Sequence, residues 1–334
     1  MMIDLPFIWA GIIAFSVLTY VILDGFDLGV GILFPFADEN QDRDIMMNSI
    51  APVWDGNETW LVMGGGGLFA VFPLAYATVL PALYMPIIIM LLALIFRGVA
   101  FEYRWRTQRW KRVWDLSFFG GSFIAAFMQG IALGALVQGI AVENREYVGG
   151  WWDWLTPFSL LTGFAVVSGY ALLGSTWLIM KTNDELQIRM RNITWIFAVS
   201  TLIFIGLISI VTPFLNPVYF ERWFAFPTMI YTSLVPLLVI YASWKLFVGL
   251  IQQSDFAPFF SSLVIFVLCF IGIGISFYPN IVPPSLTISE AAAPDSSLLF
   301  TLYGTVVLVP LILGYTAYAY WVFRGKVDPR EGYH

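Results

Sequence analysis

Four carboxylates form two closely spaced pairs in apolar parts of the chain. Asp24 and Asp27 are three residues apart, and Asp55 and Glu58 have the same spacing. Residues three apart lie on one side of a helix, so each pair would present its two carboxyl groups together. Ionisable groups at membrane depth are costly and typically mark ion or proton pathways. The spacing therefore points to proton relay, with ion pairing as the structural alternative.

An arginine within another apolar stretch is the candidate partner of these carboxylates. In a helix that begins near residue 82, Arg97 lies roughly 22 Å from the start. Asp24, Asp55 and Glu58 are the acidic groups expected nearest to it in depth, and Glu102 closes the same stretch at the membrane boundary. Two interpretations stay open: an ion-pair network that fixes helix packing, or the mouth of a proton path from the cytoplasm.

Glycines accompany the first carboxylate pair. Residues 24–31 are Asp-Gly-Phe-Asp-Leu-Gly-Val-Gly. Small residues let two membrane helices approach each other closely. We therefore expect Asp24 and Asp27 to face neighbouring helices rather than lipid.

The composition places these residues in a membrane protein. The chain has 334 residues, of which 59% are hydrophobic and only 11% charged, and its mean hydropathy is +0.81. Soluble domains contain about 25% charged residues. A polytopic membrane protein is therefore predicted, and a soluble enzyme, a disulfide scaffold and a disordered chain are excluded. With a net charge of -6 and no large basic run, the sequence gives no reason to expect a nucleic-acid partner.

The pattern of apolar stretches predicts nine membrane-spanning helices, each long enough for a hydrocarbon core about 30 Å thick. The fold class is therefore all-α and polytopic, with short loops and no inserted soluble domain. The predicted spans are residues 6–34, 55–79, 82–101, 115–139, 156–180, 193–213, 223–244, 258–279 and 298–323. A cleavable signal peptide is not expected, because the N-terminus lacks basic residues and the first apolar run is too long.

The basic residues predict the orientation. If the N-terminus is outside, the inner loops and tail hold all of the 16 Lys and Arg residues except Arg97, Arg145 and Arg222. Cytoplasmic loops are enriched in Lys and Arg, and Trp gathers at both interfaces. The sequence therefore predicts an outside N-terminus and a cytoplasmic C-terminus.

The residues that bind redox metals are nearly absent. The single histidine is His334 at the C-terminus, and the single cysteine is Cys269. Haem iron and iron–sulfur clusters need His, Cys, Met or Tyr ligands, and the scattered methionines are those of an apolar core. We therefore expect no haem, copper, zinc or iron–sulfur centre in this chain, and no redox activity by the chain alone.

Three motifs together resemble subunit II of the cytochrome bd quinol oxidases. They are residues 24–31, residues 48–60 (Asn-Ser-Ile-Ala-Pro-Val-Trp-Asp-Gly-Asn-Glu-Thr-Trp) and residues 96–104 (Phe-Arg-Gly-Val-Ala-Phe-Glu-Tyr-Arg). The resemblance is specific over roughly residues 4–140. The Pro52-Val-Trp54 form of the second motif looks closest to the cyanide-insensitive branch of the family.

The resemblance implies a place in a larger complex. Subunit II of this family is haem-free and pairs with a larger subunit I, which carries haem b, haem d and the quinol site, often with a single-helix accessory subunit. The complex oxidises quinol and reduces O2 to water in a prokaryotic inner (plasma) membrane. The implied fold is one membrane domain (1–334) with a four-helix bundle in residues 1–140, a second in 141–280, and a peripheral ninth helix and cytoplasmic tail in 281–334.

The resemblance also implies roles for particular residues. The family's proposed proton channel starts at subunit II carboxylates that match Asp24 and Asp55, with Asp27 and Glu58 beside them in the motifs. Trp54 is expected to pack next to this path, and Arg97 and Glu102 match charged family positions. A structural quinone is a further expectation without assigned residues. A proton-coupled transporter and a purely structural scaffold subunit remain the alternative functions.

Overall fold

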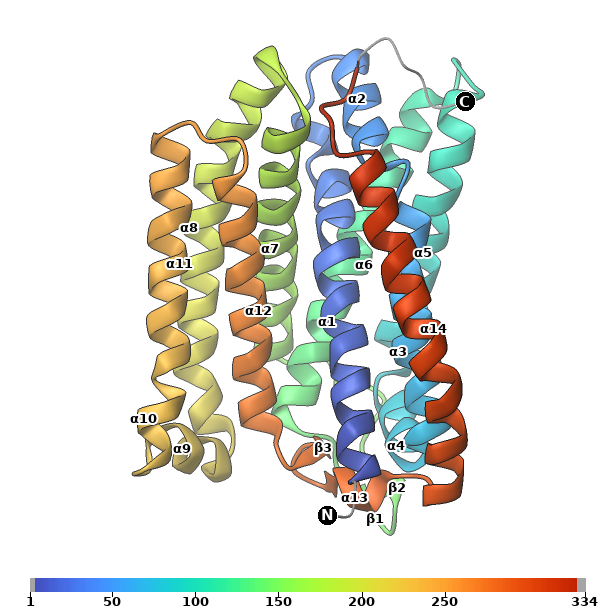
Figure 1. The fold of residues 1–334 in the computed structure, drawn as a ribbon, viewed down its shortest axis with the longest axis vertical. Helices are drawn as coiled ribbons and strands as arrows, with labels where there is room; N and C mark the ends of the chain where they lie inside the picture. Colours follow the sequence, from blue (N-terminus) through green and yellow to red (C-terminus); the bar gives the residue numbers. More distant parts are fainter. Residues whose placement is uncertain (1–3, 329–334) are drawn as a thin grey trace.

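The computed structural model describes residues 4–328, most of them in long helices that run side by side (Figure 1). In this part of the chain, eight helical segments are long and apolar enough to cross a membrane. They are α1 (Leu5–Ile32), α5 (Tyr84–Trp105), α6 (Lys111–Gln138), α7 (Pro157–Lys181), α8 (Asp184–Leu215), α10 and α11 (Thr228–Thr232 and Leu234–Ile251), α12 (Ala257–Phe277) and α14 (Asp295–Val322). The prediction of an all-α polytopic membrane protein is confirmed.

The second predicted span, residues 55–79, folds as two helices. These are α3 (Trp54–Val71) and α4 (Pro73–Ala82), and Phe72 between them has φ -129° and ψ 61°. Proline has no N–H to donate and disfavours a helical conformation in the residue before it, so the helix breaks there. The carboxylates and glycines of α3 also lower its hydropathy, and α3 is not among the eight apolar segments.

Short elements fill several predicted loops. η1 (Phe34–Phe36) and α2 (Asn40–Ile50) occupy the loop predicted at 35–54. α9 (Pro217–Phe224) lies mainly in the loop before the span predicted at 223–244. α10 occupies the first part of that span, so the long helix α11 begins later than predicted. At the end where α1 begins lie the hairpin β1 (Val142–Glu143) and β2 (Glu146–Tyr147), the antiparallel pair β3 (Asn280–Val282) and β4 (Leu286–Thr287), and α13 (Ile288–Ala291).

Helix α1 lies at the centre and packs against α3, α6 and α7. Glycines permit this packing. A Cβ on Gly29 would overlap the Tyr170 carbonyl and lie 2.8 Å from the Gly174 nitrogen of α7. Asp24 and Asp27 in the same helix are fully buried. The expectation that the glycines bring these carboxylates against protein is confirmed.

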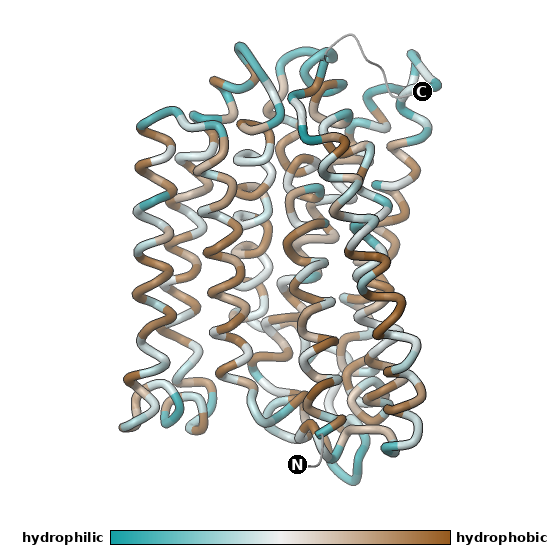
Figure 2. Tube along the Cα trace, in the orientation of Figure 1, coloured by the Kyte–Doolittle hydropathy of each residue, from teal (hydrophilic) through white to brown (hydrophobic). Residues whose placement is uncertain are grey.

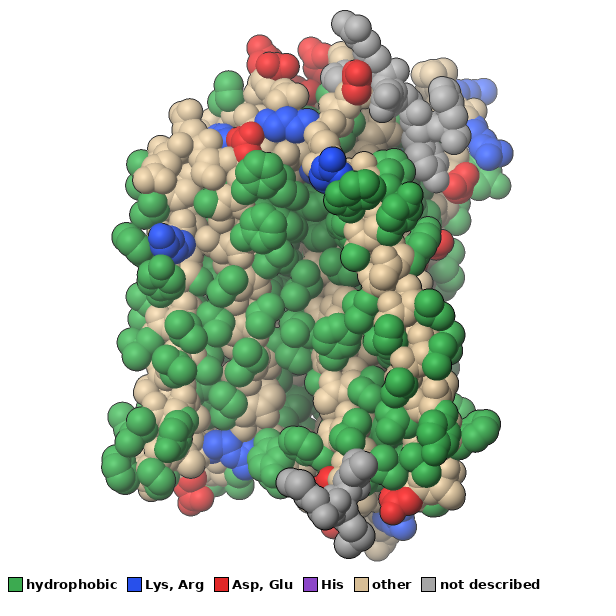
Figure 3. Space-filling model, in the orientation of Figure 1, with side chains coloured by type: hydrophobic (Ala, Val, Ile, Leu, Met, Phe, Trp, Pro, Cys, Tyr) green, Lys and Arg blue, Asp and Glu red, His purple; other side chains and the backbone are tan. Residues whose placement is uncertain are grey.

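The surface has the layered character of a membrane protein. The tube in Figure 2 is mainly apolar through its middle and hydrophilic toward its two ends. Hydrophobic side chains cover the middle of the face in Figure 3, with charged groups toward the top and bottom. Helix α1 begins at the bottom of Figure 1 and α14 ends at the top. His334 lies outside the described residues.

Candidate functional site

Three carboxylates converge on the guanidinium of Arg97 in α5. Its Nη1 lies 2.6 Å from Oδ1 of Asp24 and 3.2 Å from Oε1 of Glu58, and its Nη2 lies 3.9 Å from Oδ2 of Asp27. The carboxylates come from α1 and α3. The structure therefore brings together four of the residues singled out in the sequence, which we call the Arg97 cluster.

The Arg97 cluster contains more acidic than basic groups. Arg97, Asp24 and Asp27 are fully buried, and the Glu58 side chain is 28% exposed. Among the described residues, Asp24 Oδ2 and Asp27 Oδ1 have no hydrogen-bond partner. Buried charges are costly unless they are paired and hydrogen-bonded. One cation faces three carboxylates here, so the cluster holds an excess of acidic groups at a buried position.

A hydrogen-bonded bridge links the cluster to α14. Asn57 Nδ2 donates to Asp27 Oδ2 over 2.7 Å, and the Tyr320 hydroxyl donates to Asn57 Oδ1 over 3.0 Å. Neither residue had a role predicted from the sequence. Asn57 lies between Asp55 and Glu58 in the second motif, and this position could have identified it as a candidate site residue. Tyr320 is 263 residues from Asn57, and nothing in the sequence indicated that the two residues would meet.

A second chain of polar groups begins beside Asp24. Tyr20, one turn earlier in α1, interacts electrostatically with Asp24. The Tyr20 hydroxyl accepts a hydrogen bond from Gln129 Nε2, and Gln129 Oε1 accepts one from the Tyr170 hydroxyl, both over 2.8 Å. Since Tyr20 accepts from Gln129, its own proton is free to be donated toward Asp24. This chain joins α1, α6 and α7 at the cluster.

The remaining predicted site residues lie outside the ion pairs of the cluster. Asp55 is exposed at the start of α3, close enough to Glu58 to interact with it electrostatically. Trp54 stacks on Phe101 of α5 with ring centroids 4.8 Å apart, which is a packing contact beside the cluster. Glu102 has a 51% exposed side chain and pairs with Arg106 over 3.7 Å. Asp55 is thus placed between solvent and the buried groups, whereas Glu102 makes a surface pair.

A second buried arginine on α5 was missed. Arg104 is fully buried, with Nη1 2.5 Å from Asp44 and Nε 2.5 Å from Asp115. Lys111 lies 3.2 Å from Asp44, and Arg43 lies 3.4 Å from Asp115. We call these five residues the Arg104 cluster. From the sequence, Arg104 was used as an inner-loop charge for topology and as the last residue of the third motif, and its position at the end of a span did not reveal its burial.

Carboxylates at the opposite end of the molecule have local roles. Glu290 accepts hydrogen bonds from the backbone and hydroxyl of Thr287, and these bonds lower the pKa of Glu290. Asp153 accepts from the Gly150 backbone and the Tyr147 hydroxyl. Burial together with nearby Asp153 raises the pKa of Tyr147. These groups stabilise turns and do not form a buried cluster of the kind around Arg97.

Two features of the described residues bear on the binding of a metal or a quinone. Across residues 4–328, no group of three or more His, Cys, Asp or Glu could hold a metal ion. An apolar groove of about 410 Å³ lies between α1 and α14 and contains one hydroxyl, that of Thr305. That hydroxyl already donates to the Thr301 carbonyl. A quinone headgroup needs donors for its carbonyl oxygens, so this groove fits an apolar chain better than a quinone ring.

Comparison with known proteins gives a consistent result. The family model described as cytochrome bd terminal oxidase subunit II matches residues 5–323. The chain is 33% identical to cytochrome bd-I ubiquinol oxidase subunit 2 of Escherichia coli (strain K12), over 98% of this chain and 96% of the relative. It is 30% identical to cytochrome bd ubiquinol oxidase subunit 2 of Bacillus subtilis (strain 168), over 97% of both chains.

A solved structure shares the fold. A chain in the structure of bd oxidase from Geobacillus thermodenitrificans matches with a TM-score of 0.79 and 17% sequence identity. The match covers 96% of this chain and 99% of the other. The helix arrangement described above is therefore shared along nearly the whole length of both chains.

Proposed function

The chain belongs to the cytochrome bd terminal oxidase subunit II family, and from that premise we propose that it is the haem-free subunit that delivers cytoplasmic protons to a haem-bearing subunit I. As a family member it is a subunit of a respiratory quinol oxidase and a multi-pass inner-membrane protein. Haems b and d, held in subunit I, would carry electrons from quinol to O2. This chain's part is to bind and pass protons.

The excess of carboxylates in the Arg97 cluster supports this proposal most directly. Each O2 reduced to two waters consumes four protons along with four electrons. Asp55 is exposed and Glu58 is partly exposed, so these two groups can exchange protons with water. Glu58 and Asp24 both contact Nη1 of Arg97, which places a buried acceptor next to the partly exposed one. A proton taken up at Asp55 can thus reach Asp24 through Glu58, with Arg97 stabilising whichever carboxylate is ionised.

The finer architecture belongs to the same proposal. Helices α3 and α4 together cover residues 54–82, about 43 Å at helical rise, which is long enough for a ninth crossing. We assign α1, α3, α5 and α6 to a first bundle in residues 1–140 and α7, α8, α11 and α12 to a second in residues 141–280. Within the proposed bundles α5 packs closely on α6 and α11 on α12, while α1 and α6 also pack closely on α7, where the two bundles meet. Helix α14 buries only Leu298, as expected of a peripheral helix in residues 281–334.

We assign the α2 end of the molecule to the cytoplasm. In the described residues, that end carries ion pairs made by Arg43, Arg104, Lys111, Arg189, Arg191 and Lys326. Enrichment of Lys and Arg on the cytoplasmic side supports this orientation. The N-terminus is then outside. A single-helix accessory subunit and a structural quinone remain expectations from the resemblance to the family.

The test is to replace Asp24 and Asp55 singly by Asn in the assembled oxidase. We expect the haem spectrum of the complex to be retained and quinol-driven O2 uptake to fall at least tenfold, because an amide cannot release a proton. Asp115→Asn is the matched control, since it alters a carboxylate on the other buried arginine. Unchanged O2 uptake in both Asn variants would contradict the relay.

The scaffold alternative rests on the same ion pairs and makes a different prediction. If the Arg97 cluster only fixes helix packing, Asp24→Asn should reduce the amount of assembled complex while leaving O2 uptake per haem unchanged. The ratio of O2 uptake to haem content therefore separates the two functions.

A further inference from the structure

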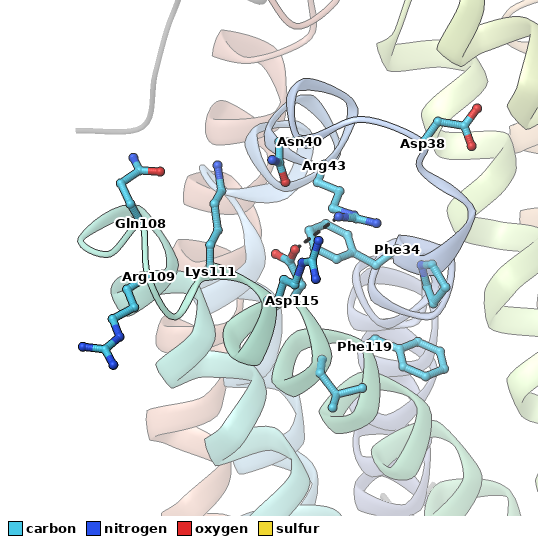
Figure 4. A pocket seen from close by; sticks show the side chains of 12 residues that line it. Phe34, Asp38, Asn40, Arg43, Gln108, Arg109, Lys111, Asp115 and Phe119 are labelled. Atoms are coloured by element: carbon cyan, nitrogen blue, oxygen red, sulfur yellow. Dashed lines mark hydrogen bonds and ion pairs between the residues drawn. The ribbon is translucent and has the colours of Figure 1, made fainter.

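A pocket of about 680 Å³ opens at the α2 end, away from the Arg97 cluster (Figure 4). It lies between η1, α2 and the beginning of α6. Its lining includes four basic residues, Arg43, Arg109, Lys111 and Arg112. Figure 4 shows Arg43 and Lys111 around its centre and Arg109 at its outer edge.

The acidic residues of the pocket are already neutralised. Asp115 is paired with Arg43 and Arg104, and Asp38 lies 2.6 Å from Nη2 of Arg189. Within residues 4–328, no carboxylate pairs with Arg109 or Arg112, both of which are exposed. The pocket therefore carries uncompensated positive charge, which is complementary to an anion.

The lower part of the pocket is apolar. Leu116 lies one turn after Arg112 in α6, with 67% of its surface exposed, and Phe119 follows in the next turn. Phe34 and Pro35 of η1 complete this part. Because α6 continues from here into the apolar layer, the pocket has its charges at the membrane surface and its apolar side chains toward the hydrocarbon. A soluble anion would use only the upper half.

We propose that this pocket binds the phosphate group of an anionic phospholipid. Arg109, Arg112 and Lys111 contact the phosphate, and an acyl chain lies along Leu116 and Phe119. Basic pockets between membrane helices on the cytoplasmic side suit acidic lipid headgroups. A free phosphate has the same headgroup chemistry, but only a lipid also covers the exposed apolar side chains. This site is independent of the proton path.

The experiment measures lipid retention by the purified oxidase complex. Delipidated complex is titrated with phosphatidylglycerol and followed by native mass spectrometry, in parallel with phosphatidylcholine of the same acyl chains and with inorganic phosphate. Arg109→Gln and Arg112→Gln should each weaken phosphatidylglycerol binding about fivefold, which corresponds to about 1 kcal/mol per basic residue near the membrane surface. Phosphatidylcholine binding should be weak and unchanged.

Arg106→Gln is the matched control. Arg106 lies on the same loop with a 76% exposed side chain, pairs with Glu102 and does not line the pocket. Equal phosphatidylglycerol retention by wild type and the double variant that combines Arg109→Gln with Arg112→Gln, or equal affinity for the two lipids, would overturn the proposal. Retention of inorganic phosphate as tight as that of phosphatidylglycerol would assign the pocket to a soluble anion. Loss of subunit I from the double variant would assign this surface to the subunit interface, and either result would overturn the lipid assignment.

Discussion

Arg97 and Arg104 lie on the same helix, seven residues apart, and both are fully buried, yet their surroundings differ in charge. Arg97 faces three carboxylates with no second cation among the described ion pairs. Arg104 faces two carboxylates, Asp44 and Asp115, and each of these has another cation nearby. About 10 Å along α5 therefore separates an acidic cluster from a basic one.

The difference in charge shows that a buried arginine can have two different roles. In the Arg104 cluster every carboxylate is matched by a cation, so ionised groups suffice and the cluster ties α2, α5 and α6 together. In the Arg97 cluster three carboxylates share one cation, so charge pairing alone does not match every acidic group there. We interpret the Arg104 cluster as structural and the Arg97 cluster as the one suited to proton transfer. Four predictions test this contrast.

Loss of the arginine side chain should be most damaging at position 97. Arg97→Leu leaves three carboxylates without a cation, a loss expected to cost about 3–5 kcal/mol. Arg104→Leu should cost less, about 1–3 kcal/mol, because Lys111 and Arg43 still pair with the carboxylates. The measurement is thermal unfolding of the detergent-solubilised complex. The deficit of Arg97→Leu should narrow as the pH falls, since protonation removes the unpaired charges. Equal losses at the two positions would contradict the contrast.

Asn57→Leu should have the next largest effect. The substitution removes the hydrogen bonds that Asn57 makes with the fully buried Asp27 and with the half-buried Tyr320, so both groups lose that partner. Each unsatisfied buried group costs about 1–3 kcal/mol. We expect a lower unfolding temperature of the complex together with slower O2 uptake, because Asp27 belongs to the acidic cluster. Thr59→Leu, on an exposed position of the same helix, is the control. A stable complex with full turnover would show that Asn57 does not position Asp27.

The depth of the acidic cluster could be predicted from the sequence, because distance along a helix is simple arithmetic. A rise of 1.5 Å per residue placed Asp24, Glu58 and Arg97 at similar depths, and the structure has them in contact. The glycines after Asp24 likewise predicted close packing of this helix against its neighbours. Depth alone did not distinguish Asp55 from Glu58, since the direction of a side chain around the helix axis decides whether it faces protein or the exterior.

Other parts of the structure had no comparable signal. Tyr320 lies on α14, a helix with so few buried residues that hydropathy does not reveal which side faces the protein. Arg104 had the sequence context of an ordinary loop charge. Pro73 indicated the break at Phe72, but the largely apolar run of residues 68–83 concealed it. Short aromatic helices before α11 likewise resembled the beginning of a membrane span.

Tyr320→Phe should have a modest effect on stability. It tests the hydrogen bond from Tyr320 to Asn57 separately from the hydrogen bond from Asn57 to Asp27. The variant keeps the ring, which packs 6.2 Å from Trp177, and loses only the hydrogen bond to Asn57. A single hydrogen bond contributes about 1 kcal/mol. We expect a small decrease in unfolding temperature and an O2 uptake per haem close to wild type, since Asn57 still donates to Asp27. A decrease in turnover as large as that of Asn57→Leu would move Tyr320 into the proton path.

Glu102→Gln should have the smallest effect, even though Glu102 lies between Arg97 and Arg104 on α5. Its side chain is half exposed and pairs with Arg106, four residues later, over 3.7 Å. Exposed pairs of this kind contribute about 0.3–0.5 kcal/mol, so the unfolding temperature of the complex should barely change. O2 uptake at several pH values is the second measurement. Glu102 pairs with Arg106 and not with a residue of either cluster, and a pH profile that matches wild type is therefore expected. A shifted profile would instead connect Glu102 to the acidic cluster and extend the proton-binding region further along α5 toward the cytoplasm.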